Sequence, residues 1–310
     1  MSQAPDSRRK GIFKNPMALL AVIVGIITAL YVSSHAHADT VRFPDAQNAR
    51  FSVTVTGTGP DIILIPGLAS SSAVWDGTVA KLKDHYRLHV LNLSGFAGEQ
   101  AGANAQGDIL PAEVEAIHAY IAANHLKSPV VVGHSLGGLL SLMLAKAHPD
   151  DARKIVIADA LPFIGVLFSP TATVDAVKPQ AAAMRDGMQA MPADAFKGQQ
   201  TAMTQRFVTS EADRARVLDW SMTSDRHVVA EAFYEDMATD LRADLPAIKT
   251  PAVLIYPAAP GVQASMFDQM YRAAYATKPA IDFVRIDNSL HFEMLDQPDA
   301  FNTALEAALK

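Results

Sequence analysis

The chain has 310 residues, of which 50% are hydrophobic and 19% charged, a composition that suits one well-cored domain with an insertion, or two small domains. Its formal net charge of −6 provides no basic surface for nucleic acid. Because the sequence contains no cysteine, thiol catalysis, thiolate metal sites and disulfides are excluded. We therefore expect neither a nucleic-acid partner nor thiol chemistry.

The first 38 residues have the pattern of a targeting segment. Basic residues 8–10 and Lys14 precede the apolar residues 17–32, and a small-x-small site at residues 36–38 follows. This order predicts a signal peptide and an exported protein, periplasmic or secreted. The apolar run is almost long enough to cross a bilayer, so an uncleaved membrane anchor through residues 17–32 stays open as an alternative.

From residue 51 onward, apolar runs of strand length alternate with segments of helical period. The strands are expected at residues 51–56, 61–65, 88–93, 129–132, 154–158, 252–256 and 281–286. The helices between and after them are expected at residues 73–82, 110–124, 266–275 and 300–309. The first strand alternates as a half-exposed edge strand does. The alternation predicts an α/β fold, with a mostly parallel central sheet flanked by helices.

The strand pattern disappears between residues 162 and 244. Here the sequence is rich in alanine and has a helical pattern, with methionines at positions 184, 188, 191, 203, 222 and 237. We predict a helical cap at 162–244, inserted into an α/β core made of residues 39–161 and 245–310. Methionine adapts to irregular apolar shapes, so we expect some of these residues to line a substrate pocket and most to form the core of the cap.

A Gly-x-Ser-x-Gly motif around Ser135 carries the clearest chemical signal. Three valines precede Gly133, and a Leu-rich segment of helical pattern follows Gly137. Strand, sharp turn and helix would place the Ser135 hydroxyl beyond the sheet edge, where a nucleophile sits. A β carbon on either glycine would collide with the opposite segment. The three fixed positions alone have roughly a 0.1 chance of arising in such a chain, and an ordinary turn with a hydroxyl cap is the alternative.

A serine nucleophile needs a base, and a third group that holds the base. Of the ten histidines, only His291 follows the last predicted strand in a short loop, so we predict it as the general base. His134 is adjacent to Ser135, but neighbouring residues on a tight turn point apart. We therefore expect His134 to be a packing or supporting residue.

Four short blocks, taken together, resemble the α/β-hydrolase fold family. They are Ile-Pro-Gly-Leu at 65–68, Leu-Ser-Gly-Phe-Ala-Gly at 93–98, Gly-His-Ser-Leu-Gly-Gly at 133–138 and Asn-Ser-Leu-His-Phe at 288–292. They occur in the order found in that family, and the resemblance covers residues 51–309. It implies a serine, acid, histidine order along the chain. It also implies an oxyanion hole formed by the backbone N–H groups of Leu136 and Leu68.

The sequence position of the acidic residue that would hold His291 departs from the family pattern. Most members carry it shortly after the strand that corresponds to residues 252–256, but residues 257–263 of this chain contain no carboxylate. Some members carry it instead at the position of Asp159, the tip of the preceding strand. Asp159 is therefore the expected acid. Asp268, in the helix after residue 263, is the alternative.

The resemblance implies a serine hydrolase that cleaves an uncharged ester or related acyl substrate through an acyl-enzyme, without a cofactor. Neither a His-Glu-x-x-His metal motif nor a Gly-x-Gly-x-x-Gly dinucleotide motif occurs in the sequence. Two alternatives stay open. One is a cofactor-free haloperoxidase or perhydrolase that uses the same three residues, and the other is a catalytically silent binding protein. The sequence leaves the acyl chain and the oligomeric state undetermined.

Overall fold

The computed structural model describes residues 39–41, 49–169 and 171–310. Residues 1–38, predicted as a signal or an anchor, lie outside the described residues. Among the residues that are described, none of the helices has the length and apolar character needed to cross a membrane.

Eight strands of the described chain form one sheet in the order β1-β2-β4-β3-β5-β6-β7-β8. Their bounds are β1 Asp39–Val41, β2 Phe51–Thr56, β3 Asp61–Ile65, β4 Arg87–Leu93, β5 Val130–His134, β6 Lys154–Ala158, β7 Ala252–Ala258 and β8 Ile281–Asp287. Strands β3 to β8 pair in parallel, whereas β2 pairs antiparallel with β1 and β4. The predicted mostly parallel sheet is confirmed. The edge position predicted for residues 51–56 is wrong, because β1 pairs outside β2.

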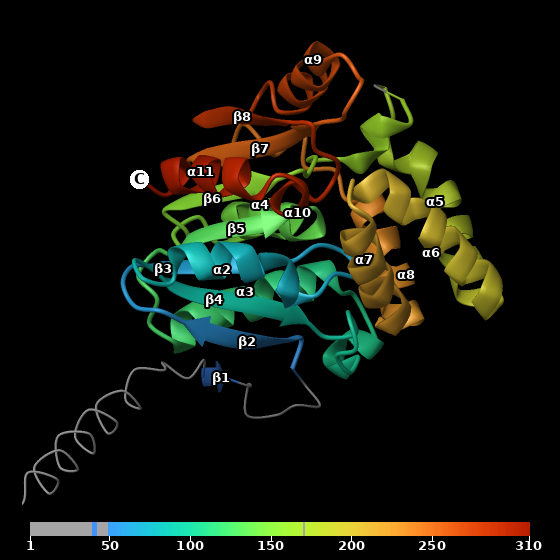
Figure 1. Cartoon of the computed structure of the whole chain (residues 1–310), viewed down its shortest axis with the longest axis horizontal. Helices are drawn as coiled ribbons and strands as arrows, with labels where there is room; N and C mark the ends of the chain where they lie inside the picture. The colour runs from blue at the N-terminus through green and yellow to red at the C-terminus, as the bar shows by residue number, and fades with distance from the viewer. Residues whose placement is uncertain (1–38, 42–48, 170) are drawn as a thin grey trace, which may run out of the picture. The chain divides into compact units, whose positions relative to one another are not determined.

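Helices cover both faces of the sheet (Figure 1). They are α2 Asp76–Leu82, α3 Leu110–Ala123, α4 Leu136–Ala147, α9 Ala264–Ala274, α10 Glu293–Asp296 and α11 Pro298–Leu309, with short 3-10 turns η1 Ser72–Trp75, η2 Gly102–Ala105 and η3 Ile164–Leu167. Successive side chains of a strand point to opposite faces. Accordingly Ile63 packs in one core with residues of α3, α4 and α9, while Ile62 packs in a second core with α2 and α11.

A helical insertion separates β6 from β7, as predicted. It contains α5 Val174–Ala190, α6 Ala193–Phe207, α7 Glu211–Thr223 and α8 Arg226–Ala238, which lie together beside one end of the sheet (Figure 1). The side chains of Thr173, Ser210 and Asp225 each accept a hydrogen bond from the first turn of α5, α7 and α8, respectively. These caps satisfy backbone N–H groups that have no partner within the helix, and they explain where the three helices begin.

Candidate active site

Ser135 occupies a strained turn between β5 and α4, with φ +53° and ψ −120°. Its own N–H donates to the carbonyl of Ala158 at 2.9 Å. A β carbon on Gly133 would lie 2.0 Å from the carbonyl oxygen of Gly137, and one on Gly137 would lie 2.4 Å from that of Ile65. The strand, the helix and the neighbouring loop therefore approach this closely only because both positions are glycine.

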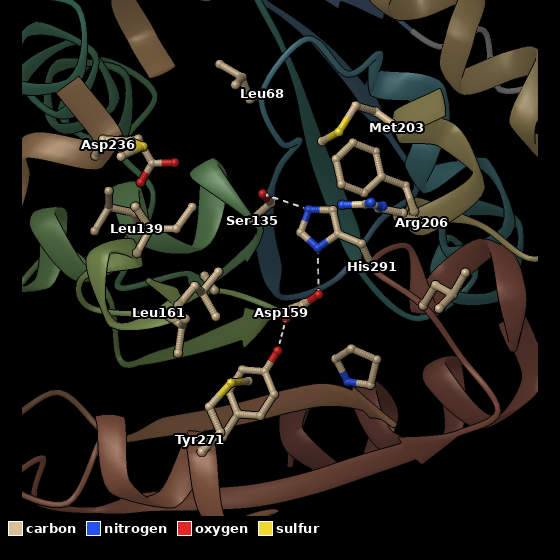
Figure 2. A pocket seen from close by; sticks show the side chains of 18 of the residues that line it. Leu68, Ser135, Leu139, Asp159, Leu161, Met203, Arg206, Asp236, Tyr271 and His291 are labelled. Atoms are coloured by element: carbon tan, nitrogen blue, oxygen red, sulfur yellow. Dashed lines mark hydrogen bonds and ion pairs between the residues drawn. The ribbon is translucent and has the colours of Figure 1, made fainter. Parts of the chain in front are cut away.

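Ser135, His291 and Asp159 lie in hydrogen-bonding contact, although 156 and 132 residues separate His291 from the other two in sequence (Figure 2). Nε2 of His291 is 3.0 Å from Oγ of Ser135, and Nδ1 is 2.6 Å from Oδ2 of Asp159. A carboxylate oxygen only accepts, so Nδ1–H is the donor in that pair. Nε2 then carries the lone pair that faces the serine hydroxyl, which is the arrangement a general base requires.

Asp159 is held by more than the histidine. It follows β6 with φ +43°, and its N–H donates to the carbonyl of Ile255 at 2.9 Å. The hydroxyl of Tyr271, on α9, donates to the second carboxylate oxygen. Burial, together with the charge of Asp159, raises the pKa of Tyr271 well above its usual value, so this hydroxyl stays protonated and remains a donor.

Glu293 is a second carboxyl near Asp159. It is fully buried, and within the part of the chain that the structure describes no residue forms a hydrogen bond with either of its carboxyl oxygens. Burial and the neighbouring charge of Asp159 raise the pKa of Glu293 well above its usual value. Glu293 is therefore a neutral acid beside Asp159.

Asp268, the alternative acid, forms hydrogen bonds with residues other than His291. Its two carboxylate oxygens accept from the hydroxyl of Tyr256 and from Nη1 of Arg285, each at 2.7 Å. These contacts lie along α9 and the outer strands β7 and β8, and none of them involves His291. The structure thus brings Asp159 to the histidine and leaves Asp268 in a partly exposed ion pair.

The two segments predicted to hold an oxyanion flank Ser135. Leu136 is the first residue of α4, where backbone N–H groups have no acceptor within the helix and the helix dipole favours negative charge. Leu68 lines the same cavity as Ser135. The loop that carries it passes close by, since a β carbon on Gly67 would lie 3.1 Å from Cβ of Ser135.

His134 supports the loop that carries His291. It is fully buried, and Nε2–H donates to the carbonyl of His291 at 2.8 Å. Burial lowers the pKa of His134 to about 3, so the ring is neutral and its hydrogen bond persists across the physiological pH range. This contact agrees with the supporting role predicted for His134.

A cavity of about 650 Å³ opens onto Ser135 and His291. Most of its wall is apolar, and α6, α8 and α9 contribute much of it. Of the six methionines noted in the sequence, Met184, Met203 and Met237 line this cavity. The sequence reasoning missed Tyr271, Asp236 and Arg206, which also line it, because nothing in their spacing connects helices of the insertion and α9 with the serine motif.

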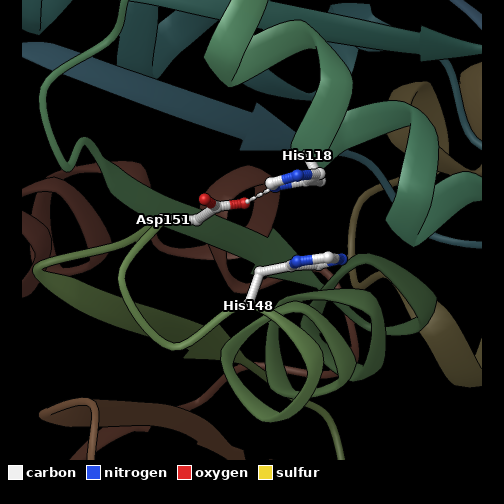
Figure 3. A group of neighbouring side chains, drawn as sticks. All are labelled: His118, His148 and Asp151. Carbon is white, nitrogen blue, oxygen red and sulfur yellow. Dashed lines mark hydrogen bonds and ion pairs between the residues drawn. The ribbon is translucent and has the colours of Figure 1, made fainter.

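A separate group of His118, His148 and Asp151 lies on α3 and just beyond α4 (Figure 3). Nδ1 of His118 is 2.8 Å from Asp151, and Nε2 of His148 is 3.0 Å from Glu115. The two rings stack with centroids 3.8 Å apart and an interplanar angle of 6°. Imidazole lone pairs lie in the ring plane, so two parallel rings do not direct them at one point. We therefore assign no metal to this group.

Comparison with known families agrees with the fold. The sequence model of the family described as the alpha/beta hydrolase fold matches residues 60–244. The chain belongs to this family. Solved structures share the architecture, among them a bromoperoxidase from Bacillus anthracis with a TM-score of 0.71 at 18% identity, covering 88% of this chain and 99% of that one. Identity this low demonstrates the fold alone.

Curated relatives are named pimeloyl-[acyl-carrier protein] methyl ester esterase. The one from Vibrio atlanticus is 36% identical over 108 residues, which are 35% of this chain and 39% of that protein, so the chain spans about two fifths of that relative's length. The one from Aeromonas hydrophila is 26% identical over 271 residues, 82% of this chain and 97% of that protein.

These relatives contradict the location predicted from residues 1–38. They are named for an ester of an acyl-carrier protein, and their names denote neither export nor a membrane role. The prediction of a periplasmic, secreted or membrane-anchored protein is therefore corrected. The basic residues, the apolar run and the small-x-small site at residues 36–38 produced that prediction, and this order of residues is not specific to export.

Proposed function

We propose that the chain is a serine hydrolase that cleaves a carboxylic ester through an acyl-enzyme on Ser135. The observation that carries the proposal is the continuous hydrogen-bonded series from Asp159 through His291 to Ser135, which ends at a cavity large enough for a small substrate. The names of the curated relatives, all ester hydrolases, support the same reaction.

In the proposed reaction, His291 accepts the proton of Ser135 while Oγ attacks the ester carbonyl. The negative charge on the carbonyl oxygen is stabilised by the N–H groups of Leu136 and Leu68, at roughly 3 to 4 kcal/mol per donor. His291 then donates its proton to the departing alkoxide, which leaves as an alcohol. A water molecule deprotonated by His291 attacks the acyl-enzyme, the bond to Oγ of Ser135 breaks to release the acid, and His291 returns the proton to Oγ. Asp159 stabilises the imidazolium in both steps.

The kind of ester that we propose as substrate is inferred from the cavity. Its wall is mostly apolar, so a hydrocarbon chain on the ester gains about 25 cal/mol for each Å² it buries there. We assign part of that wall, including Met203 and Phe233, to a cap of residues 162–244, and the rest to a core of residues 39–161 and 245–310. The esters named for the relatives have such a chain, and we propose an uncharged ester of that general kind.

The test combines labelling with turnover. We expect a fluorophosphonate probe to label the wild-type protein, and p-nitrophenyl esters of short fatty acids to be hydrolysed. Ser135→Ala should lose the label and at least about a thousandfold in kcat, because the nucleophile is gone. Ser128→Ala, a change of an exposed serine outside the site, should keep both. A folded wild-type protein that takes no label would overturn the proposal and favour the binding-protein alternative.

A further inference from the structure

Asp236 is a carboxyl of the cavity wall that the proposed reaction does not use. It projects from α8, where its neighbours Phe233 and Met237 also line the cavity. In the view of Figure 2, its carboxyl lies on the opposite side of Ser135 from Arg206. Asp236 therefore faces the space that a substrate would fill.

The other acids of α8 have structural partners. Glu235 accepts from the backbone N–H groups of Ile109 and Leu110 at 2.8 and 2.7 Å, at the beginning of α3. Glu231 lies 3.6 Å from Arg185 in an ion pair. For the Asp236 carboxyl, by contrast, no hydrogen bond or ion pair is formed with any residue of the described ranges. This difference on one helix indicates that Asp236 does not serve the packing of the insertion.

A carboxyl without a hydrogen-bond partner is energetically unfavourable in an apolar wall. Burial raises the pKa of Asp236 to about 7, against the opposing influence of His291. Near neutral pH, Asp236 is thus divided between an acid that can donate and a carboxylate that can only accept. A ligand group that pairs with either form would satisfy this half-buried carboxyl, which otherwise has no partner in the described ranges.

We propose that Asp236 determines substrate specificity by binding a hydrogen-bond-donating group, a hydroxyl or a protonated amine, on the chain that fills the cavity. This inference rests on the proposed ester hydrolysis at Ser135. A hydroxyl pairs with both forms of the carboxyl, and an ammonium group pairs with the carboxylate. A plain alkyl chain leaves Asp236 unpartnered, and a chain that ends in a carboxylate is repelled.

The test uses p-nitrophenyl esters of four acids whose chains have the same number of heavy atoms along their length: heptanoic, ω-hydroxyhexanoic, ω-aminohexanoic and, as its half-ester, adipic acid. In the wild-type protein, we expect kcat/KM for the hydroxyl and amino chains to exceed that for the plain and anionic chains by about tenfold or more. Asp236→Leu should abolish both preferences. Asp236→Asn should keep the preference for hydroxyl and lose that for ammonium, because an amide forms hydrogen bonds but is uncharged.

Glu231→Gln is the matched control, an acid on the same helix that is paired with Arg185 outside the cavity wall, and it should leave the four ratios unchanged. Thermal unfolding checks that the variants fold. Asp236→Leu should unfold at a temperature no lower than the wild type, because it removes an unpartnered carboxyl. Two results would overturn this inference while leaving ester hydrolysis intact. One is equal kcat/KM for all four esters in the wild type, and the other is a set of kcat/KM ratios that is the same in Asp236→Leu as in the wild type.

If the proposed ester hydrolysis is wrong, the same experiment gives a different result. If the wild type hydrolyses none of the four esters, the reaction proposed at Ser135 is wrong. Calorimetric binding of the four corresponding primary amides then tests Asp236 without turnover. Tighter binding of the hydroxyl and amino amides by the wild type than by Asp236→Leu supports the assignment, and equal binding overturns it.

Discussion

Asp159 holds His291 through one carboxylate oxygen and receives the hydroxyl of Tyr271 on the other. Its place at the end of β6 lets it reach the histidine from the strand beside β5, which carries the serine. At the place where most family members carry the acid, the end of β7, this chain has Pro257, Ala258 and Ala259, and Pro257 contributes to the cavity wall instead. These individual side-chain positions support the proposal that Asp159 is the acid.

Substitution of the two candidate acids tests this assignment. Asp159→Asn should lower kcat by roughly 10³ to 10⁴, because an amide neither fixes the required tautomer of His291 nor stabilises its charged form. Asp268→Asn loses a partly exposed pairing with Arg285 and should keep kcat within about twofold. Steady-state hydrolysis of one p-nitrophenyl ester measures both. Loss of turnover in a folded Asp268→Asn protein alone would mean that the acid is Asp268.

At the scale of elements, the junction of β5 and α4 depends on glycine, which has no side chain, at positions 133 and 137. A β carbon on Gly133 would be 2.0 Å from a backbone oxygen of Gly137, and neither backbone can move without disturbing the strand or the first helical turn. Gly187, inside α5, is the opposite case, since a β carbon there meets nothing within 4 Å.

These two glycines predict opposite changes in stability. Gly133→Ala should lower the free energy of unfolding by about 2 kcal/mol or more, through overpacking. Gly187→Ala should raise it by about 0.5 to 1 kcal/mol, because alanine favours the helix and the position has room. Urea unfolding followed by circular dichroism measures both. A neutral Gly133→Ala would show that strand and helix are less tightly coupled than the contacts indicate.

At the scale of the whole molecule, buried acids link stability to pH. Glu113 on α3 is fully buried, and Nδ2 of Asn104 donates to it at 2.6 Å, while its other oxygen has no partner among the described residues. Burial raises its pKa from 4.5 to about 8. The unfolded chain thus releases this proton at a lower pH than the native protein, so its contribution to stability is complete below pH 4.5 and is lost as pH rises towards about 8.

Glu113→Gln removes this titration. The variant should therefore gain stability relative to the wild type as pH rises from 4.5 to about 8, by an amount on the order of a few kcal/mol. Denaturant unfolding at a series of pH values measures the difference. Glu115→Gln, on the same helix at the surface, should follow the wild type. If the curves of Glu113→Gln and the wild type run parallel across this range, Glu113 is ionised in the native protein.

Local pattern in the sequence determined much of the fold. Runs such as residues 61–65 and 154–158 match β3 and β6, because a strand buried on both faces requires consecutive apolar residues wherever it lies in the sheet. Ser135 was found for the same reason, since its turn requires glycines at fixed, nearby positions. The edge assignment of residues 51–56 failed because pairing with β1 is a property of two segments and not of one.

The sequence by itself thus determined the α/β alternation, the helical insertion and the serine, all of which follow from residues close together along the chain. Only the tertiary structure brought Asp159 and not Asp268 to His291, joined Tyr271 to Asp159, and turned Asp236 into the cavity. These arrangements join residues more than a hundred positions apart or depend on which way a helix face points. Sequence spacing carries no information about either, because packing of the whole chain sets both.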